Sequence, residues 1–272
     1  MFEGDEYKQK IQSSFDLASH GYDSPGLRFF SSSAAHLVET LNLNGNENLI
    51  DIATGTGHVA IRAAEALKGG AVVGVDLSEG MLGVARRKAD EKSLPNVTFR
   101  RLDFEKMDFE ENSFDVACCA FGLFFLDDMA RGLARISKVV KPGGKVALAS
   151  FTKSMMEPLS QKALDMLETY GIKPPALSWK KLDTPEKIND LIDATKLGDV
   201  KIESKQIGYY LKDSGQWWEI LWNSGYRGLL NQLDENDLMR FKRDHLKEVD
   251  QLAGGDGIWL DVEALYAVAT NS

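Results

Sequence analysis

The sequence predicts an α/β fold with a mostly parallel sheet of seven strands, an antiparallel final strand, helices on both faces and a helical cap. Between residues 49 and 151, short β-rich apolar runs alternate with longer runs of helical periodicity. This alternation indicates parallel strands joined by crossover helices. Beyond residue 151 the rhythm changes, and two further alternating runs, 200–211 and 258–269, supply an antiparallel pair.

The expected core elements follow one another closely along the chain. A strand at 49–53 runs into a glycine turn, and Val59 opens a run of helical spacing that Gly69 and Gly70 end. Pro142, followed by two glycines, ends the last core helix in the same way. The remaining core strands are expected at 71–75, 97–101, 114–120 and 145–151, and the helices at 81–91 and 126–140.

The flanking segments read as mainly helical. Residues 5–42 indicate two helices around a loop at 21–26, and Thr184 followed by Pro185 is typical of a helix start. Further helices are expected at 154–170, 216–232 and 234–252. We therefore divide the chain into an N-terminal helical cap at 1–48, an α/β core at 49–152, and a C-terminal part at 153–272 with a helical cap at 213–257.

Composition excludes several classes of protein. Of the 272 residues, 41 are acidic and 32 basic, and the net charge of −9 argues against nucleic-acid binding. No apolar run reaches the roughly 18 residues of a membrane span, and the acidic start of the chain is unlike a secretory signal, so we expect a cytoplasmic protein. Cys118 and Cys119 are adjacent and cannot form a disulfide scaffold, and the histidines lack metal-ligand spacing. A metal-free protein with a small-molecule partner is expected, and its oligomeric state is left open.

One motif combines a glycine turn with a distant acid. Gly55 and Gly57 lie where the first strand meets a helix N-terminus, which favours close approach of a ligand. Asp76 ends the second strand twenty-one residues beyond Gly55, where a carboxylate can accept hydrogen bonds from ribose hydroxyls. The pattern predicts a nucleoside cofactor. The alternative is a tight turn beside a solvated acid.

Two other functions remain open at this point. The run from Gly55 to Ala60 also fits the dinucleotide fingerprint of an NAD(P)-dependent oxidoreductase. Against that stand Asp51 inside the first strand, where dehydrogenases usually have an apolar residue, and the lack of a downstream Tyr-x-x-x-Lys pair. The third possibility is a non-catalytic cofactor-binding module.

Over residues 48–152 the sequence resembles the class I S-adenosylmethionine-dependent methyltransferases. Four segments carry this resemblance: Asp51–Gly57, Val75–Leu82, Asp103–Phe104 with Asn112–Asp115, and Val140–Gly144. The run from Ala120 to Leu123 is most similar to the ubiquinone/menaquinone C-methyltransferase branch. The resemblance implies a Rossmann-like core that binds S-adenosyl-L-methionine.

The resemblance also implies roles for individual residues around that cofactor. The methionine part would lie over Asp51 and the backbone of Ala53, Thr54, Gly55 and Gly57. The nucleoside would contact Asp76 at the ribose, Leu77 and Met81 at the adenine ring, and Asp103 with the Phe104 backbone at the adenine amino group. The sulfonium and the substrate would face Ala120 and Phe121, with Tyr22 and Arg28 closing over the cofactor.

Acceptor recognition is expected from aromatic residues outside the core motifs. Trp218, Trp222 and Tyr226 recur at steps of four, which predicts one helix face and, with Arg227, an apolar pocket. Phe124 is a further candidate, whereas the alternative for the helix face is docking of the cap onto the sheet. No catalytic acid or base is assigned, because in-line methyl transfer depends chiefly on alignment. We therefore expect transfer to a small aromatic or lipophilic acceptor.

Overall fold

The computed structural model describes residues 4–174 and 177–272, whose contacts group into two compact units. Unit 1 comprises the described residues of Met1–Phe29, Ser154–Leu177 and Gln206–Glu263. Unit 2 comprises Phe30–Lys153, Ser178–Lys205 and Ala264–Ser272. Each unit is assembled from separate stretches of chain. The domain boundaries predicted at residues 48 and 152 divide the chain linearly, and they stay a prediction.

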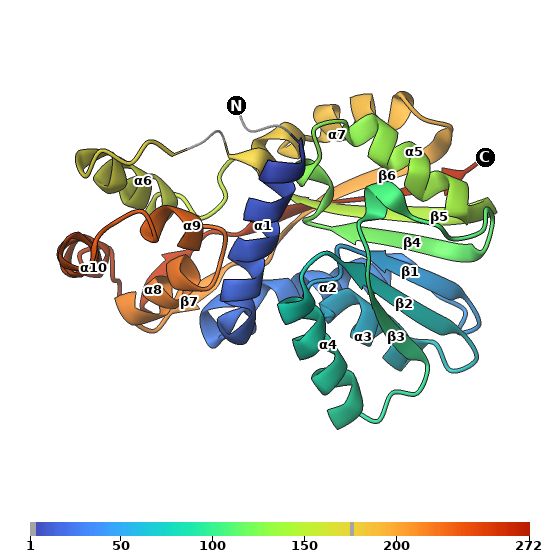
Figure 1. Ribbon diagram of the computed structural model, residues 1–272, viewed down its shortest axis with the longest axis horizontal. Helices are drawn as coiled ribbons and strands as arrows, with labels where there is room; N and C mark the ends of the chain where they lie inside the picture. Colours follow the sequence, from blue (N-terminus) through green and yellow to red (C-terminus); the bar gives the residue numbers. More distant parts are fainter. Residues whose placement is uncertain (1–3, 175–176) are drawn as a thin grey trace. The chain divides into compact units, whose positions relative to one another are not determined.

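The centre of unit 2 is a seven-stranded sheet in the order β3-β2-β1-β4-β5-β9-β6 (Figure 1). Its first five strands pair in parallel, and β9 pairs antiparallel with β5. The predicted fold class is therefore confirmed. The strands are β1 (Asn48–Ile52), β2 (Ala71–Asp76), β3 (Val97–Arg101), β4 (Phe114–Ala120), β5 (Val140–Phe151), β6 (Leu197–Gln206) and β9 (Glu263–Asn271).

Helices cover both sides of this sheet. Helix α3 packs with α4 and α5 packs with α7, and Figure 1 shows the two pairs on opposite sides of the strands. The α-helices assigned to this unit are α2 (Phe29–Thr40), α3 (His58–Ala66), α4 (Glu79–Glu91), α5 (Met129–Val139) and α7 (Pro185–Asp193). Short 3₁₀ helices lie at Phe104–Lys106, Leu123–Phe125 and Ser178–Leu182.

Local sequence explains these elements. Strand β1 is buried from its second residue onward, because strands covered on both faces are apolar throughout. The Ser78 side chain caps α4, and Thr184 caps α7 with Pro185 in its first turn, as predicted. Cys118 and Cys119 are buried in β4, which confirms them as core strand residues. Burial raises the pKa of Cys119 to about 12, so its thiol stays protonated.

Unit 1 is a helical assembly with a small hairpin. Helix α10 packs on α6 and α8 and buries Phe241, His245 and Val249 at steps of four. The buried Trp217 donates its indole N–H to His245 Nε2 at 2.7 Å. The elements are α1 (Gly4–Ala18), α6 (Leu159–Thr169), α8 (Ser214–Trp222), α9 (Arg227–Leu230), α10 (Glu235–Asp250), β7 (Tyr209–Leu211) and β8 (Ile258–Leu260), with 3₁₀ helices at Ser19–Gly21 and Pro25–Leu27.

The two C-terminal runs, each expected to be one strand, are both divided. The run at 200–211 breaks into β6 and β7, and the run at 258–269 into β8 and β9. Strand β7 pairs with β8 outside the main sheet, while β9 pairs with β5. Gly208 marks the break, since a Cβ there would lie 2.4 Å from the Leu260 carbonyl oxygen. The close backbone approach at this corner lets the chain change sheets.

The prediction of one long helix at 216–232 is also wrong. Helix α8 ends at Trp222, Asn223 leaves helical geometry at φ −113°, and Ser224 and Gly225 separate it from α9. Gly225 is a weak helix former, and its flexibility favours a break at this point. Tyr226 therefore lies outside α8, and the prediction that it shares a helix face with Trp218 and Trp222 fails.

Candidate functional site

A left-handed turn connects β1 to α3. Ala53, Gly55 and Gly57 have φ values of 54°, 56° and 81°, and α3 begins at the next residue. A Cβ on Gly57 would lie 3.0 Å from Ala85 Cβ, so both the backbone angle and the packing on α4 require glycine. A Cβ on Gly55 would meet nothing within 4 Å. The turn is therefore open on that side, next to the start of a helix.

Asp51 is buried beneath this turn. Its Oδ2 accepts hydrogen bonds from Thr54 Oγ1 at 2.5 Å and from the Ala60 N–H at 3.0 Å. Burial raises the pKa of Asp51 to about 7, although these two hydrogen bonds lower it. The charge of the Asp76 carboxylate also raises it. None of the groups that perturb Asp51 is a cation. A cationic ligand above the turn would stabilise its ionised form.

Asp76 at the end of β2 reaches the same turn. Its Oδ2 accepts the Gly55 N–H at 2.8 Å and its Oδ1 accepts the Ser78 N–H at 2.9 Å. The acid and the glycine turn, twenty-one residues apart in sequence, are thus in direct contact. The Asp76 side chain is half-buried, and each oxygen of an ionised carboxylate can accept more than one hydrogen bond.

Left-handed backbone angles occur at the ends of both β1 and β4. Phe121 follows β4 with a φ of 57°, and Ala53 follows β1 with a φ of 54°. Left-handed angles in such residues cost about 1–3 kcal/mol and cluster at functional sites. A Cβ on Gly122 would lie 2.5 Å from Ala53 Cβ, so the two loops are tightly packed. The strand order changes direction here, which is where open α/β sheets bind ligands.

Three phenylalanines gather at the same edge of the sheet. The Phe121 ring stacks on Phe151 with centroids 4.2 Å apart and planes at 18°. Phe30, near the start of α2, contacts both rings edge-on, at 5.6 Å and 6.4 Å. Sequence reasoning identified Phe121 but missed Phe30 and Phe151. The position of Phe151 at a parallel strand's carboxyl end was a usable signal, whereas Phe30 had none.

The other predicted core residues also follow carboxyl ends of strands. Asp103, after β3, caps a 3₁₀ helix by accepting the Glu105 N–H at 3.0 Å. The structure leaves two of the remaining side chains half-buried, Leu77 and Ala120, and buries the other three, Met81, Phe104 and Phe124.

Two residues predicted to close over the cofactor, Tyr22 and Arg28, belong to unit 1. Within that unit, Tyr22 packs edge-on against Phe15 at 6.1 Å. The Arg28 guanidinium lies 3.4 Å from the centre of the Tyr209 ring and donates to the carbonyl oxygens of Pro25 and Tyr210. Their contact with the cofactor remains a prediction.

The aromatic residues predicted for the acceptor also lie in unit 1. Trp218 and Trp222 stack at 5.6 Å, and Arg227 lies over the Trp222 ring at 3.5 Å. Tyr226 is half-buried overall, burial of its hydroxyl raises its pKa to about 12, and that hydroxyl is hydrogen-bonded to Ser160. Tyr226 is therefore part of the packing of unit 1. The acceptor-binding roles of all four residues stay predictions.

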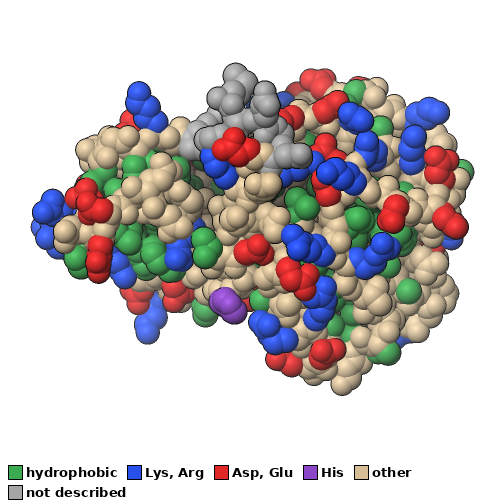
Figure 2. Space-filling model, viewed as in Figure 1, with side chains coloured by type: hydrophobic (Ala, Val, Ile, Leu, Met, Phe, Trp, Pro, Cys, Tyr) green, Lys and Arg blue, Asp and Glu red, His purple; other side chains and the backbone are tan. Residues whose placement is uncertain are grey.

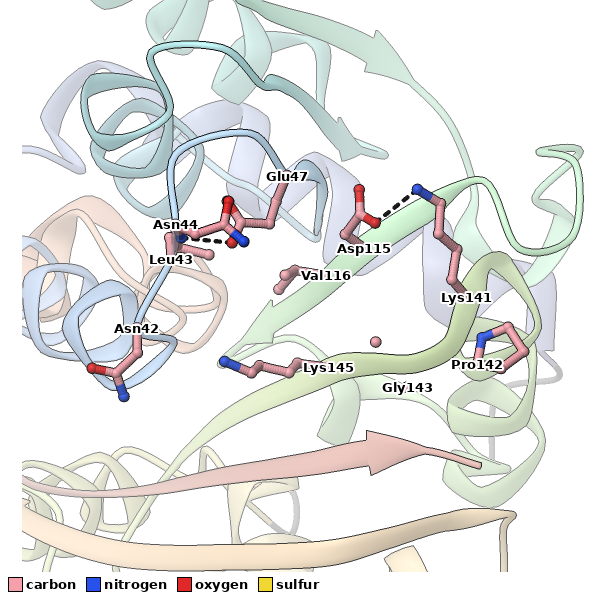
Figure 3. A pocket seen from close by; sticks show the side chains of 11 residues that line it. Asn42, Leu43, Asn44, Glu47, Asp115, Val116, Lys141, Pro142, Gly143 and Lys145 are labelled. Carbon is pink, nitrogen blue, oxygen red and sulfur yellow. Dashed lines mark hydrogen bonds and ion pairs between the residues drawn. The ribbon is translucent and has the colours of Figure 1, made fainter.

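A cavity of about 320 Å³ lies at the opposite, amino edge of the sheet (Figure 3). Figure 3 shows Lys141 and Asp115 pointing toward each other, paired at 2.7 Å, and Glu47 turned toward Asn44, whose N–H it accepts at 2.7 Å. The Lys145 ammonium donates to the Leu41 carbonyl. These side chains stabilise the loops that begin β1 and β5, whereas the glycine turn and the buried acid lie at the carboxyl edge.

The described residues contain neither a metal-binding cluster nor a helix that could span a membrane. Within 4–174 and 177–272, no group of three or more His, Cys, Asp or Glu side chains is placed to hold a metal ion. No helix in that part of the chain has the length and apolarity to cross a membrane. Figure 2 shows acidic and basic side chains interspersed over the face in view.

Known proteins are similar to this chain in sequence and in fold. Residues 49–144 match the methyltransferase domain family. Aklanonic acid methyltransferase DauC of Streptomyces sp. strain C5 is 32% identical over 145 residues, which cover 53% of this chain and 66% of that protein. The chain belongs to the class I S-adenosylmethionine-dependent methyltransferases. The family match spans the glycine turn, Asp76 and Asp103, and ends within the Pro142–Gly144 turn.

Other members of the family agree with this assignment. The ubiquinone/menaquinone biosynthesis C-methyltransferase UbiE of Bdellovibrio bacteriovorus is 33% identical over 146 residues, covering 52% of this chain and 61% of that protein. The chain thus spans less than two thirds of either curated relative. The YcgJ protein from Bacillus subtilis shares the fold, with a TM-score of 0.59 and 17% identity over 89% of this chain and 99% of that one.

Proposed function

We propose that this chain transfers a methyl group from S-adenosylmethionine to a small molecule, an aromatic or lipophilic acceptor. The observation that carries the proposal is the group of features at the carboxyl edge of β1, β2 and β4. An open glycine turn lies over a buried acid and donates its Gly55 N–H to a second acid, Asp76. The family match covers these same residues.

The chemistry of this edge fits the proposed cofactor. The N-terminus of α3 would meet its carboxylate, and Asp51 would face its positive charges. Asp76 would accept from the ribose hydroxyls, while Leu77 and Met81 would pack against the adenine ring. Asp103 would accept from the adenine amino group next to the Phe104 backbone. When bound, S-adenosylmethionine supplies an electrophilic methyl group on a sulfonium sulfur.

The residues after β4 and β5 would orient the acceptor. The loop that begins at Phe121 is strained, so its conformation is fixed in advance of binding. Phe30, Phe121 and Phe151 form an apolar aromatic cluster at the end of the sheet, next to Ala120. Such a surface keeps water away, and a medium of low dielectric favours the joining of a nucleophile with a cation.

The names of the relatives support an acceptor of this kind. DauC is named for aklanonic acid and the Bdellovibrio enzyme for ubiquinone and menaquinone biosynthesis. We propose a comparable small-molecule acceptor for this chain. We also propose that Tyr22 and Arg28 contact the bound cofactor, and that Trp218, Trp222, Tyr226 and Arg227 serve the acceptor side.

Calorimetric titrations with S-adenosylhomocysteine and NADH test the cofactor first. We expect S-adenosylhomocysteine alone to bind, because the buried Asp51 and the open turn suit an amino-acid nucleoside. Tritiated methyl transfer to a panel of phenols, hydroxyquinones and aromatic acids then tests catalysis, with Phe121→Gly expected to lower the rate through a mobile loop. Binding of NADH would identify an oxidoreductase. Binding of S-adenosylhomocysteine without transfer to any acceptor would identify a non-catalytic module.

A further inference from the structure

The Phe99 ring lies against two glycines of unit 2, one in the sheet and one in the turn. In the register of β2 with β3, Phe99 is directly opposite Gly74. A Cβ on Gly74 would lie 2.7 Å from Cδ1 and 2.8 Å from Cε1 of the Phe99 ring, and a Cβ on Gly57 would lie 3.2 Å from its Cζ. The ring therefore connects β2 to the glycine turn that follows β1.

Space, not backbone angle, explains why residue 74 is glycine. Gly74 has no left-handed φ, so its backbone alone would accept a side chain. A Cβ there would meet both the Phe99 ring and Thr54 Oγ1, the latter at 3.0 Å. Thr54 also donates its N–H to the Val75 carbonyl oxygen at 3.0 Å. The missing side chain thus lets the ring and the Thr54 hydroxyl approach the same point of β2.

Phe99 itself is held in place by α4. The Arg86 side chain on α4 donates to the Phe99 carbonyl oxygen at 3.3 Å, and α4 packs on β3 (Figure 1). Ala85, the neighbouring residue of α4, lies against Gly57, where an added Cβ would be 3.0 Å from the Ala85 Cβ. The turn is therefore backed at Gly57 by Phe99 and Ala85, whereas a Cβ on Gly55 would meet open space.

We propose that Phe99 is a positioning residue for the cofactor, because its ring sets the distance between the glycine turn and β2. The inference rests on the proposed function, since Phe99 acts on the same site through the turn. The turn contains Ala53, whose left-handed φ of 54° persists only where surrounding contacts hold it. With the ring in place, the Gly55 N–H reaches Asp76 Oδ2 at 2.8 Å, so the turn is organised before any ligand binds.

Amide hydrogen exchange in the ligand-free chain tests the contact between ring and turn. Phe99→Val keeps a residue that suits a strand but leaves empty space beside both glycines. We expect the Gly55 amide to exchange about 10-fold faster in this variant, well beyond any change in the amides of β4, which report global opening. Phe99→Leu fills more of the space and should give a smaller change in the same direction. Unchanged exchange at Gly55 would overturn the proposal.

Calorimetry of the full chain with S-adenosylhomocysteine tests the effect on the site. Phe99→Val should weaken binding about 10-fold, and so should Gly74→Ala, because its methyl group would displace the ring. In the double variant the added methyl group occupies space that the ring has left, so binding should be tighter than in Phe99→Val alone. An equal loss from Gly74→Ala in both backgrounds would show that ring and turn act independently, which contradicts the proposal.

Phe114→Val is the matched control for loss of a buried ring. Phe114 begins β4 at the amino edge of the sheet, and its ring contacts Phe109 edge-on at 5.3 Å. This variant should lower the free energy of unfolding in urea but change S-adenosylhomocysteine affinity less than about 2-fold. An equal loss of affinity in Phe114→Val and Phe99→Val would indicate general destabilisation instead of positioning. Failure of the proposed function is distinct, because the unmodified chain would then not bind S-adenosylhomocysteine, while exchange at Gly55 would still report the contact.

Discussion

At the scale of single residues, the two acids of the candidate site differ in environment. Asp51 is enclosed and receives bonds from Thr54 and Ala60, whereas Asp76 is half-buried and receives backbone bonds from Gly55 and Ser78. Burial disfavours the charged form of Asp51, while the Asp76 carboxylate is only partly removed from water. We therefore propose that Asp51 balances the positive charge of the cofactor above it, and that Asp76 accepts hydrogen bonds from the ribose.

The first prediction concerns pH and Asp51. Its pKa is raised to about 7 in the folded chain, from an ordinary value of 3.8, so the folded state holds an extra proton between these values. The stability from this group is complete below pH 4 and is lost as pH rises through 7, at up to about 1.4 kcal/mol per pH unit. Urea unfolding from pH 5 to 8 should show this fall in the ligand-free chain, and Asp51→Asn should lack it. An equally steep fall in the variant would contradict the assignment.

The second prediction concerns Asp76. Asp76→Ala removes the proposed ribose acceptor and leaves polar atoms unpaired, so S-adenosylhomocysteine should bind about 2–5 kcal/mol more weakly by calorimetry. Asp115→Ala is the matched control, because Asp115 likewise accepts a backbone N–H, from Asn48, at the opposite edge of the sheet. Equal affinities in the two variants would exclude the ribose role.

At the scale of secondary-structure elements, one buried hydrogen bond joins α8 to α10. Because Trp217 donates to His245 Nε2, the proton of the neutral imidazole lies on Nδ1. Burial lowers the pKa of His245 to about 4, and the charge of Lys162 acts in the same direction. The neutral histidine is thus part of the helix packing, and Phe241 stacks on it at 5.3 Å.

The third prediction tests this bond. Trp217→Phe keeps an aromatic ring but leaves His245 Nε2 without its donor, so unfolding free energy should fall by about 1–3 kcal/mol from the unpaired atom, plus the lost packing. Trp259→Phe makes the same change at a residue that is 41% exposed, and it should alter stability by less than about 0.5 kcal/mol. Similar losses in both variants, measured by urea unfolding at pH 7, would refute a special role for the bond.

At the scale of the whole molecule, each unit is completed by distant stretches of chain. The sheet in unit 2 needs β9, and unit 1 combines α1 with α6 and the segment from Gln206 to Glu263. A single cut in the chain therefore releases neither unit. A ligand of one site is expected to stabilise the fold through mass action alone.

The fourth prediction is a thermal shift. S-adenosylhomocysteine at 100 times its Kd should add about 2.7 kcal/mol of stability, which corresponds to roughly 5–10 °C in Tm for a chain of this size. NADH at the same concentration should produce no shift. Scanning calorimetry of the Asp76→Ala variant, with its weaker binding, should show a smaller shift at an equal ligand concentration. A shift with NADH would contradict the cofactor assignment.

The parallel core and the contact between Gly55 and Asp76 could be predicted from sequence because their signals are local. Each apolar run has the length of one strand, and parallel strands with crossover helices have few alternatives. The C-terminal runs were harder, because alternation shows that a strand forms but not which partner it pairs with. The break after Trp222 was missed because helical spacing continues across it to Tyr226 in the sequence.

The sequence by itself determined the fold class, the family and the acids beside the glycine turn, since strand ends, turns and spacing are properties of neighbouring residues. Only the tertiary structure decided that Phe30 and Phe151 join Phe121, that the final strand lies between β5 and β6, and that Arg227 rests on the Trp222 ring. The physical reason is that these features depend on contacts between distant segments. Their free energy comes from packing and desolvation in three dimensions, which a one-dimensional pattern does not encode.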